Sequence, residues 1–267
     1  KNYLVKISTM KMRSNFEELP LGGSSFVQGR EANIQAVIFD LDGTLVNTGP
    51  LITESFRHTI GEVFHEDLPL EELTALVGIP LSQQMNHFAQ KYYGERKEDY
   101  CAVPSVEHLT EILLSTYRVY CAEIRDEYIR PFDGVESFVC ELSERKIPLG
   151  VATSKRRESA ISDLSYFDLY RYFDTLIGSD DVKEPKPKPE PLLKVMDILS
   201  SKHQKKLSPI DCLYIGDSPY DIRASHAAGM LSVAVEYGMF ESDILKAEEP
   251  SYIVSTPEEL NTLLNFL

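Results

Sequence analysis

The chain has 267 residues, of which 43% are hydrophobic and 26% charged, a composition typical of a globular protein with a sizeable core. It carries 27 Lys and Arg against 42 Asp and Glu, a formal net charge of -15, so no overall basic surface is present to bind nucleic acid or an anionic membrane. No apolar run approaches the roughly 20 residues of a membrane helix. We expect a cytoplasmic protein, a monomer or homodimer, with no nucleic-acid or membrane partner.

The first 33 residues are polar and show no sustained periodicity beyond a short strand candidate at residues 3–7. They form an N-terminal extension to which the sequence assigns no role.

Five short apolar runs then have the character of buried parallel strands, and helical patterns separate the last four. Strands that alternate with helices predict a doubly wound, Rossmann-like α/β fold with a parallel sheet, whose ligand site lies at the carboxyl ends of the strands. We assign residues 34–48 and 131–267 to this core domain. The runs are residues 36–39, 149–152, 175–178, 213–215 and 231–235.

The segment between the first and second strands contains no convincing strand. It shows helical periodicity at residues 51–64 and 109–128. We therefore expect residues 49–130 to form an inserted, all-helical cap domain.

Two carboxylates, Asp40 and Asp42, follow the first predicted strand, and Gly43 and Thr44 come directly after them. Carboxylates two residues apart at a strand end can face one cleft, and Mg²⁺ prefers such oxygen ligands. The same residues also suit an Asx-type turn in any loop.

Thr153 and Ser154 follow the second strand, where hydroxyls and backbone amides at the start of a helix can hold a phosphate oxygen. Helix capping alone would also account for this pair.

Lys186 and Lys188 lie in a segment of alternating prolines, residues 184–191. Such a backbone is stiff and excludes helix and regular strand, so it can fix an ammonium beside a nucleophile and a phosphate. A rigid surface linker would have the same composition.

Asp217 and Asp221 follow the fourth strand. Asp217 is a candidate metal ligand, and Asp221 is a candidate ligand or a partner that orients one. Acidic residues in the first turn of a helix are the competing interpretation. All four clusters follow parallel strands, so a doubly wound sheet brings them to one crevice.

In the order and content of these motifs, the chain from residue 36 onward resembles the haloacid dehalogenase superfamily of phosphohydrolases. The motifs are DLDGT at residues 40–44, Thr153-Ser154, Lys186 within KPKPEP, and GDSPYD at residues 216–221. The helical insertion resembles the cap of the phosphoglycolate phosphatase-like and β-phosphoglucomutase-like branch.

The resemblance implies that Asp40 is the nucleophile and a ligand of Mg²⁺. It implies that Asp42 is the general acid and base, with its backbone carbonyl on the metal, and that Asp217 is a further ligand. We count Asp221 with the metal set, either as a direct ligand or as a partner that orients one. Lys186 is preferred to Lys188 because its Lys-Pro string continues with an acid, as in the family. Contact with the substrate phosphate is expected from Gly43, Thr44, Thr153, Ser154 and Lys186.

The leading prediction is a Mg²⁺-dependent phosphatase that hydrolyses a small phosphorylated metabolite, such as phosphoglycolate, through an aspartyl-phosphate. An inorganic pyrophosphatase or nucleotide monophosphatase would use the same residues with a different cap pocket. A sugar phosphomutase and a non-catalytic regulator that binds a phosphorylated metabolite would also be compatible with this fold.

Overall fold

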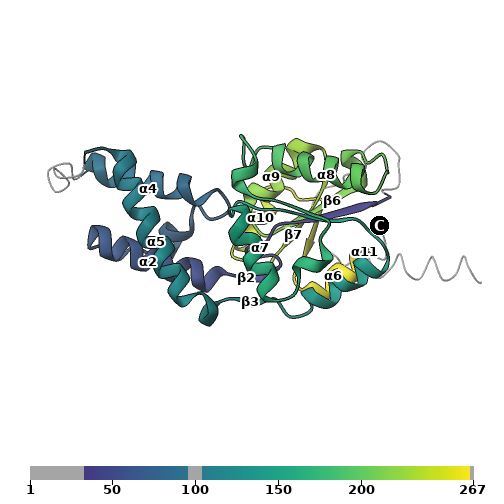
Figure 1. Ribbon diagram of the computed structural model, residues 1–267, viewed down its shortest axis with the longest axis horizontal. Helices are drawn as coiled ribbons and strands as arrows, with labels where there is room; N and C mark the ends of the chain where they lie inside the picture. The colour runs from purple at the N-terminus through teal and green to yellow at the C-terminus, as the bar shows by residue number, and fades with distance from the viewer. Residues whose placement is uncertain (1–32, 96–103, 265–267) are drawn as a thin grey trace, which may run out of the picture.

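The computed structural model describes residues 33–95 and 104–264 (Figure 1). All but the last residue of the N-terminal extension therefore lie outside the described residues. Among the described helices, none combines the length and the apolarity needed to cross a membrane.

The core is a six-stranded sheet in the order β5-β4-β1-β6-β7-β8, and every neighbouring pair is parallel. The predicted α/β fold with a doubly wound parallel sheet is confirmed. The last strand, β8, was not predicted. The strands are β1 (Ala36–Phe39), β4 (Leu149–Ala152), β5 (Thr175–Ile177), β6 (Cys212–Gly216), β7 (Leu231–Val235) and β8 (Tyr252–Val254).

Helices cover both faces of this sheet, because alternate residues of each strand point to opposite sides. Val37 and Phe39 of β1 pack in one buried cluster with α6 (Val135–Glu144), α7 (Arg157–Tyr166) and α11 (Pro257–Leu264). Ala36 and Ile38 pack in a second cluster with α8 (Glu190–Lys202) and α9 (Pro219–Ala228). Figure 1 shows α8 and α9 on one side of the sheet and α6 and α11 on the other. Burial on both faces explains why the strands are continuous apolar runs.

Short helical segments complete the core. They are α10 (Ser242–Lys246) and the 3₁₀ turns η1 (Tyr170–Tyr172), η2 (Ser179–Asp181) and η3 (Pro209–Asp211).

Strand β1 is the point at which the sheet order reverses. The chain runs outward from β1 through β4 to β5 and then crosses back to β6 on the other side of β1. The carboxyl ends of β1, β4 and β6 therefore meet around one crevice, which is where open α/β sheets bind ligands.

A group of helices, here called the cap, stands beside this edge of the sheet (Figure 1). Its helices enclose a separate buried apolar cluster that includes Phe56, Met85 and Leu113. The chain leaves for the cap through β2 (Val46–Asn47) and returns through β3 (Arg130–Pro131), which pair with each other. The cap helices are α2 (Gly49–Phe64), α3 (Leu70–Thr74), α4 (Leu81–Glu95) and α5 (Val106–Tyr128).

Candidate active site

Asp40 stands at the carboxyl end of the central strand. Its backbone N–H donates to Ile215 O at 2.8 Å, which continues the ladder between β1 and β6 by one residue. The side chain is almost entirely buried, and its Oδ1 accepts a hydrogen bond of 2.8 Å from Lys186 Nζ. Asp40 nevertheless lines a cavity that lies between the cap and the core and is described below.

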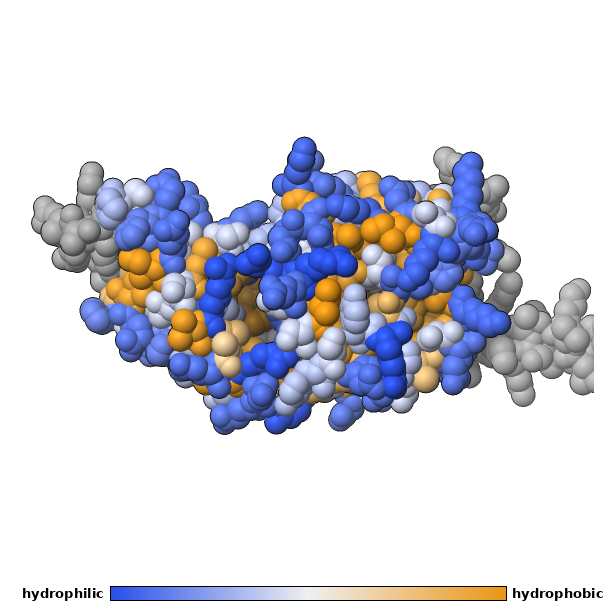
Figure 2. Space-filling model, viewed as in Figure 1, coloured by the Kyte–Doolittle hydropathy of each residue, from blue (hydrophilic) through white to orange (hydrophobic). Residues whose placement is uncertain are grey.

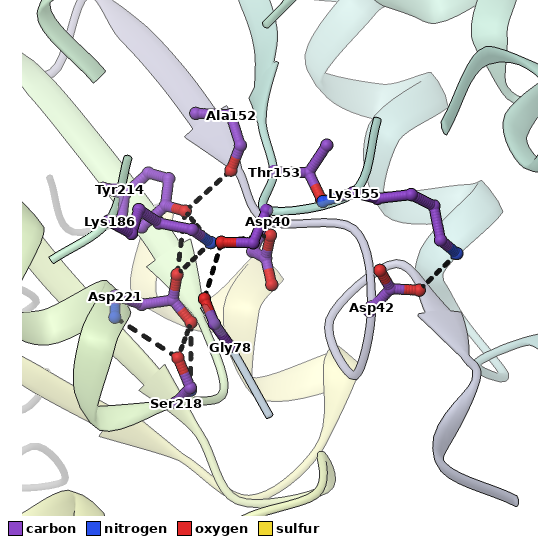
Figure 3. A network of polar contacts seen from close by, with 11 residues as sticks. Asp40, Asp42, Gly78, Ala152, Thr153, Lys155, Lys186, Tyr214, Ser218 and Asp221 are labelled. Carbon is purple, nitrogen blue, oxygen red and sulfur yellow. Dashed lines mark hydrogen bonds and ion pairs between the residues drawn. The ribbon is translucent and has the colours of Figure 1, made fainter. Parts of the chain in front are cut away.

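Lys186 supplies the positive charge behind Asp40 (Figure 3). Its ammonium lies 2.8 Å from Asp40 Oδ1 and 2.6 Å from Asp221 Oδ1, with the Tyr214 hydroxyl at 3.1 Å. Although burial lowers the pKa of Lys186, Asp221 and Asp40 together raise it above its ordinary value. The Lys186 side chain is 1% exposed, whereas Lys188 is exposed.

Asp217 follows β6 and lies against two glycines. Its Oδ2 accepts a hydrogen bond of 2.7 Å from the backbone N–H of Met239. A Cβ on Gly43 would come within 2.1 Å of Asp217 Oδ2, and one on Gly238 within 2.2 Å of Asp217 Cβ. Gly43 also has a φ of 80°, so both space and backbone conformation require glycine there.

Three carboxylates, those of Asp40, Asp217 and Asp221, offer oxygens that all lie within 4.8 Å of one another, and all three side chains are buried. Burial and the neighbouring carboxylates raise the pKa of Asp40 to about 7 and that of Asp217 well above its ordinary value. Lys186 is the one cation that the described contacts place against this group. The cluster is therefore short of positive charge, and its oxygen donors fit a divalent ion such as Mg²⁺.

Asp42 is turned away from this carboxylate cluster. Its Oδ1 accepts a hydrogen bond of 2.7 Å from Lys155 Nζ, and the same ammonium lies 2.6 Å from Asp163 Oδ2. Burial lowers the pKa of Lys155, but Asp42 and Asp163 more than offset this and raise it above its ordinary value. Lys155 is thus a cation held between two carboxylates.

Thr153 and Ser154 lie in a loop that precedes α7. The competing interpretation, in which they cap a helix, is wrong, because α7 begins at Arg157 with Arg156 as its N-cap. Thr153 Oγ1 accepts a hydrogen bond of 3.2 Å from the backbone N–H of Lys155, and Ser154 Oγ donates to Gly78 O at 2.6 Å. The loop after β4 is thereby joined to the cap.

The proline-rich segment also differs from expectation at its end. Glu190 and Pro191 belong to the first turn of α8, because the first turn of a helix does not need the N–H that proline lacks. The Glu190 carboxylate accepts hydrogen bonds from the backbone N–H groups of Lys183 and Glu184, which closes the loop that carries Lys186.

A cavity of about 570 Å³ lies between the cap and the carboxyl edge of the sheet, and Figure 2 shows the surface hollowed there. Of the sequence-predicted residues, Asp40, Asp42, Thr153, Ser154 and Asp217 line it. Gly43 and Thr44 are buried and are not among the lining residues, and Thr44 Oγ1 has no hydrogen-bond partner among the described residues. The cap contributes mainly apolar lining, including Leu51, Ile52, Phe56, Val77, Ile79 and Leu81.

Sequence reasoning missed two contributors to the site. Tyr214 belongs to an apolar strand and reads as a core residue, yet its hydroxyl bridges Lys186 and Asp221. Asp163 sits on α7 with no motif around it and binds Lys155. Three basic residues, 155–157, follow Thr153 and Ser154 in the sequence, and each of them pairs with a carboxylate.

Comparison with known proteins indicates the same family as the sequence motifs do. The chain matches the family of haloacid dehalogenase-like hydrolases over residues 37–235. A protein provisionally named pyrophosphatase PpaX, from Caldanaerobacter subterraneus subsp. tengcongensis, is 35% identical over 221 residues, which is 83% of this chain and 90% of that protein. Pyrophosphatase PpaX of Halalkalibacterium halodurans is 30% identical over 227 residues, with 85% and 95% covered. The solved structure of a predicted phosphoglycolate phosphatase from Haemophilus somnus matches with a TM-score of 0.72 at 24% identity, over 88% of this chain and 100% of that one.

The family match and these relatives extend over most of the chain, so the chain belongs to the haloacid dehalogenase-like hydrolases. Within that family it is a phosphatase.

Proposed function

We propose that the chain is a Mg²⁺-dependent phosphatase that acts on a small phosphate monoester through a phosphorylated Asp40. The observation that carries this proposal is the position of the Asp40 carboxylate. It lines the cavity, while Lys186 binds one of its oxygens from behind.

In the first step an oxygen of the Asp40 carboxylate attacks phosphorus, and the bond between phosphorus and the leaving oxygen breaks as the new one forms. Lys186 holds the carboxylate in place and offsets negative charge that gathers around the phosphoryl group. The Thr153 and Ser154 hydroxyls, together with Gly43 and Thr44, are the proposed contacts to the phosphoryl oxygens.

Asp42 is the proposed general acid and base. In its acid form it gives a proton to the leaving oxygen. As a carboxylate it then takes a proton from the water that attacks the phosphorylated Asp40, which releases inorganic phosphate and restores the Asp40 carboxylate. Asp42 lines the cavity beside Asp40, as this role requires.

Asp40 and Asp217 are the proposed side-chain ligands of Mg²⁺, together with the backbone carbonyl of Asp42. The bound ion would supply positive charge at the phosphoryl oxygens. Asp221 is better suited to orient the neighbouring side chains than to bind the ion. Its Oδ1 contacts Lys186 and Tyr214, and its Oδ2 accepts hydrogen bonds from the backbone N–H and the hydroxyl of Ser218.

A phosphate monoester is the first substrate class to consider, because the apolar cap residues over the cavity offer a surface to an organic leaving group. A phosphoglycolate-like compound is the proposed example. Pyrophosphate is the second candidate, and the observation that favours it is the name of the relatives that are 35% and 30% identical.

The test is phosphate release from phosphoglycolate, pyrophosphate, nucleotide monophosphates and hexose phosphates, with Mg²⁺ present or chelated. We expect release from one of them that requires Mg²⁺. Asp40→Asn should abolish it while the circular dichroism spectrum stays unchanged. Substantial activity of Asp40→Asn would overturn the mechanism, and no release from any compound would favour a phosphomutase or a regulator.

A further inference from the structure

The Asp42 carboxylate has a partner that the phosphatase chemistry does not use. Figure 3 shows Asp42 and Lys155 together, apart from the group formed by Asp40, Lys186 and Asp221. The distance from Lys155 Nζ to Asp42 Oδ1 is 2.7 Å, and 113 positions separate the two residues. The contact therefore depends on the fold that joins β1 to the loop after β4.

Lys155 is itself held in place along its whole length. Its backbone N–H donates to Thr153 Oγ1, and its carbonyl accepts a hydrogen bond of 2.9 Å from the backbone N–H of Ser179. Its ammonium lies 2.6 Å from Asp163 Oδ2, and the Asp163 side chain is only 7% exposed. Because both ends of Lys155 are fixed, the Asp42 carboxylate meets a fixed cation.

The chain of contacts continues from Asp163 into the cap. Arg125, on α5, donates from Nε to Asp163 Oδ1 at 2.8 Å. Its guanidinium also lies 4.9 Å from the ring centroid of Tyr166, which belongs to α7. Asp163 thus joins a cation of the cap to a cation of the core.

Every carboxylate of this group contacts a cation. Asp42 pairs with Lys155, Asp163 pairs with both Lys155 and Arg125, and the exposed Asp126 also pairs with Arg125. The cluster around Asp40 instead has three carboxylates and one lysine. Because the carboxylates around Lys155 are each paired with a cation, their contacts serve to orient side chains.

We propose that Lys155 is a positioning residue for Asp42, and that Asp163 and Arg125 fix Lys155 so that the cap helix α5 takes part in setting where the general acid and base lies. The inference rests on the proposed role of Asp42. It adds that the role depends on a lysine that does not touch the reacting atoms.

The test compares two probes that differ in their need for a proton, 4-nitrophenyl phosphate and phenyl phosphate. Phenolate is a poor leaving group, with a pKa of about 10 for its acid, and it depends on general acid catalysis more than 4-nitrophenolate does. Lys155→Met removes the ammonium and keeps an apolar stem. We expect it to lower kcat for phenyl phosphate by about 10- to 100-fold, with a smaller loss for 4-nitrophenyl phosphate and little change in KM.

Four further variants make the result specific. Lys155→Arg should restore much of the activity, and Lys188→Met, at an exposed lysine, should leave both probes unaffected. In an Asp42→Asn background, Lys155→Met should not lower kcat any further, because the carboxylate that Lys155 positions is already absent. Asp163→Asn should reproduce the preference for 4-nitrophenyl phosphate in a milder form.

Equal losses on both probes, or losses that add to those of Asp42→Asn, would overturn the positioning role and leave the phosphatase mechanism intact. An Asp42→Asn variant with full activity on phenyl phosphate would instead remove the proposed acid and base. A crystal structure of Lys155→Met supplies a readout without turnover: the Asp42 carboxylate should leave its present position, and an unmoved carboxylate would contradict the proposal.

Discussion

Asp221 shows how one side chain can serve a helix and a site together. Its Oδ2 accepts from the backbone and hydroxyl of Ser218, which forms the capping box of α9. Its Oδ1 faces Lys186 and Tyr214. The two interpretations that the sequence leaves open at Asp221, a helix start and a part of the site, are thus both present in the structure.

Lys186→Met is the most damaging single change that we expect in the core. It leaves Asp40 and Asp221 buried and close together without their cation, so it should cost about 3–5 kcal/mol of stability and abolish turnover. Thermal unfolding and phosphate release measure the two effects. Lys188→Met is the matched control, because that lysine is exposed. If Lys188→Met were the inactive variant, the assignment of the lysine would be reversed.

Asp217→Asn should stabilise the metal-free protein near pH 7. The pKa of Asp217 is raised in the folded state, so that state binds more protons than the unfolded one, and stability falls as the pH rises from about 4 toward the folded-state pKa. An asparagine avoids this loss and can still accept from the N–H of Met239. Unfolding midpoints between pH 5 and 8, with a chelator present, measure the effect.

The same variant should lose most of the stabilisation that Mg²⁺ gives the unmodified protein, because a proposed ligand is gone. Asp67→Asn changes an exposed aspartate and should alter neither property. A metal-free Asp217→Asn protein that is less stable than the parent at pH 7 would contradict the account of the carboxylate cluster.

At the scale of elements, the turn between α3 and α4 joins the cap to the core. Gly78 in this turn has a φ of 106°, and an added Cβ would lie 2.8 Å from the Tyr220 ring and 3.0 Å from Ser218 Oγ. Its carbonyl accepts from Ser154. The turn therefore depends on a glycine for both its conformation and its closeness to the core.

Gly78→Ala should lift this turn from the core, which we expect to lower kcat/KM by about tenfold or more with a small effect on the unfolding midpoint. Steady-state kinetics and thermal unfolding measure both. Gly94→Ala is the control, because an added Cβ there meets no atom within 4 Å and alanine favours the helix by about 0.5–1 kcal/mol. Unchanged kinetics in Gly78→Ala would mean that the turn takes no part in catalysis.

The elements that the sequence predicts well are those with a long or purely apolar pattern. Strands β1, β4 and β7 have the predicted bounds, and α2 and α5 begin two or three residues before the predicted segments. The sequence did not reveal β2 and β3, because two residues are too few to show a period. Strand β8 was also missed.

Some site residues can likewise be predicted from the sequence, and others cannot. Asp40, Asp217 and Lys186 follow strands or lie in an unusual segment, so their sequence context marks them. Tyr214 and Asp163 act through contacts that only the folded chain makes, and nothing in their local sequence sets them apart from core and helix residues.

At the scale of the whole molecule, the sheet and the cap supply different parts of the site. The sheet brings side chains from the ends of β1, β4 and β6 to one crevice, and the cap covers that crevice with apolar side chains. The chain as a whole carries a net charge of -15, and its site concentrates carboxylates still further. The proposed Mg²⁺ would offset this negative charge when an anionic phosphate binds.

The most direct measurement of the central claim is the mass of the protein quenched in acid during turnover with Mg²⁺. The account predicts a species heavier by one phosphoryl group, with the modification in the peptide that contains Asp40, and no such species from Asp40→Asn. Steady release of phosphate without that species, together with activity in Asp40→Asn, would contradict an aspartyl-phosphate on Asp40.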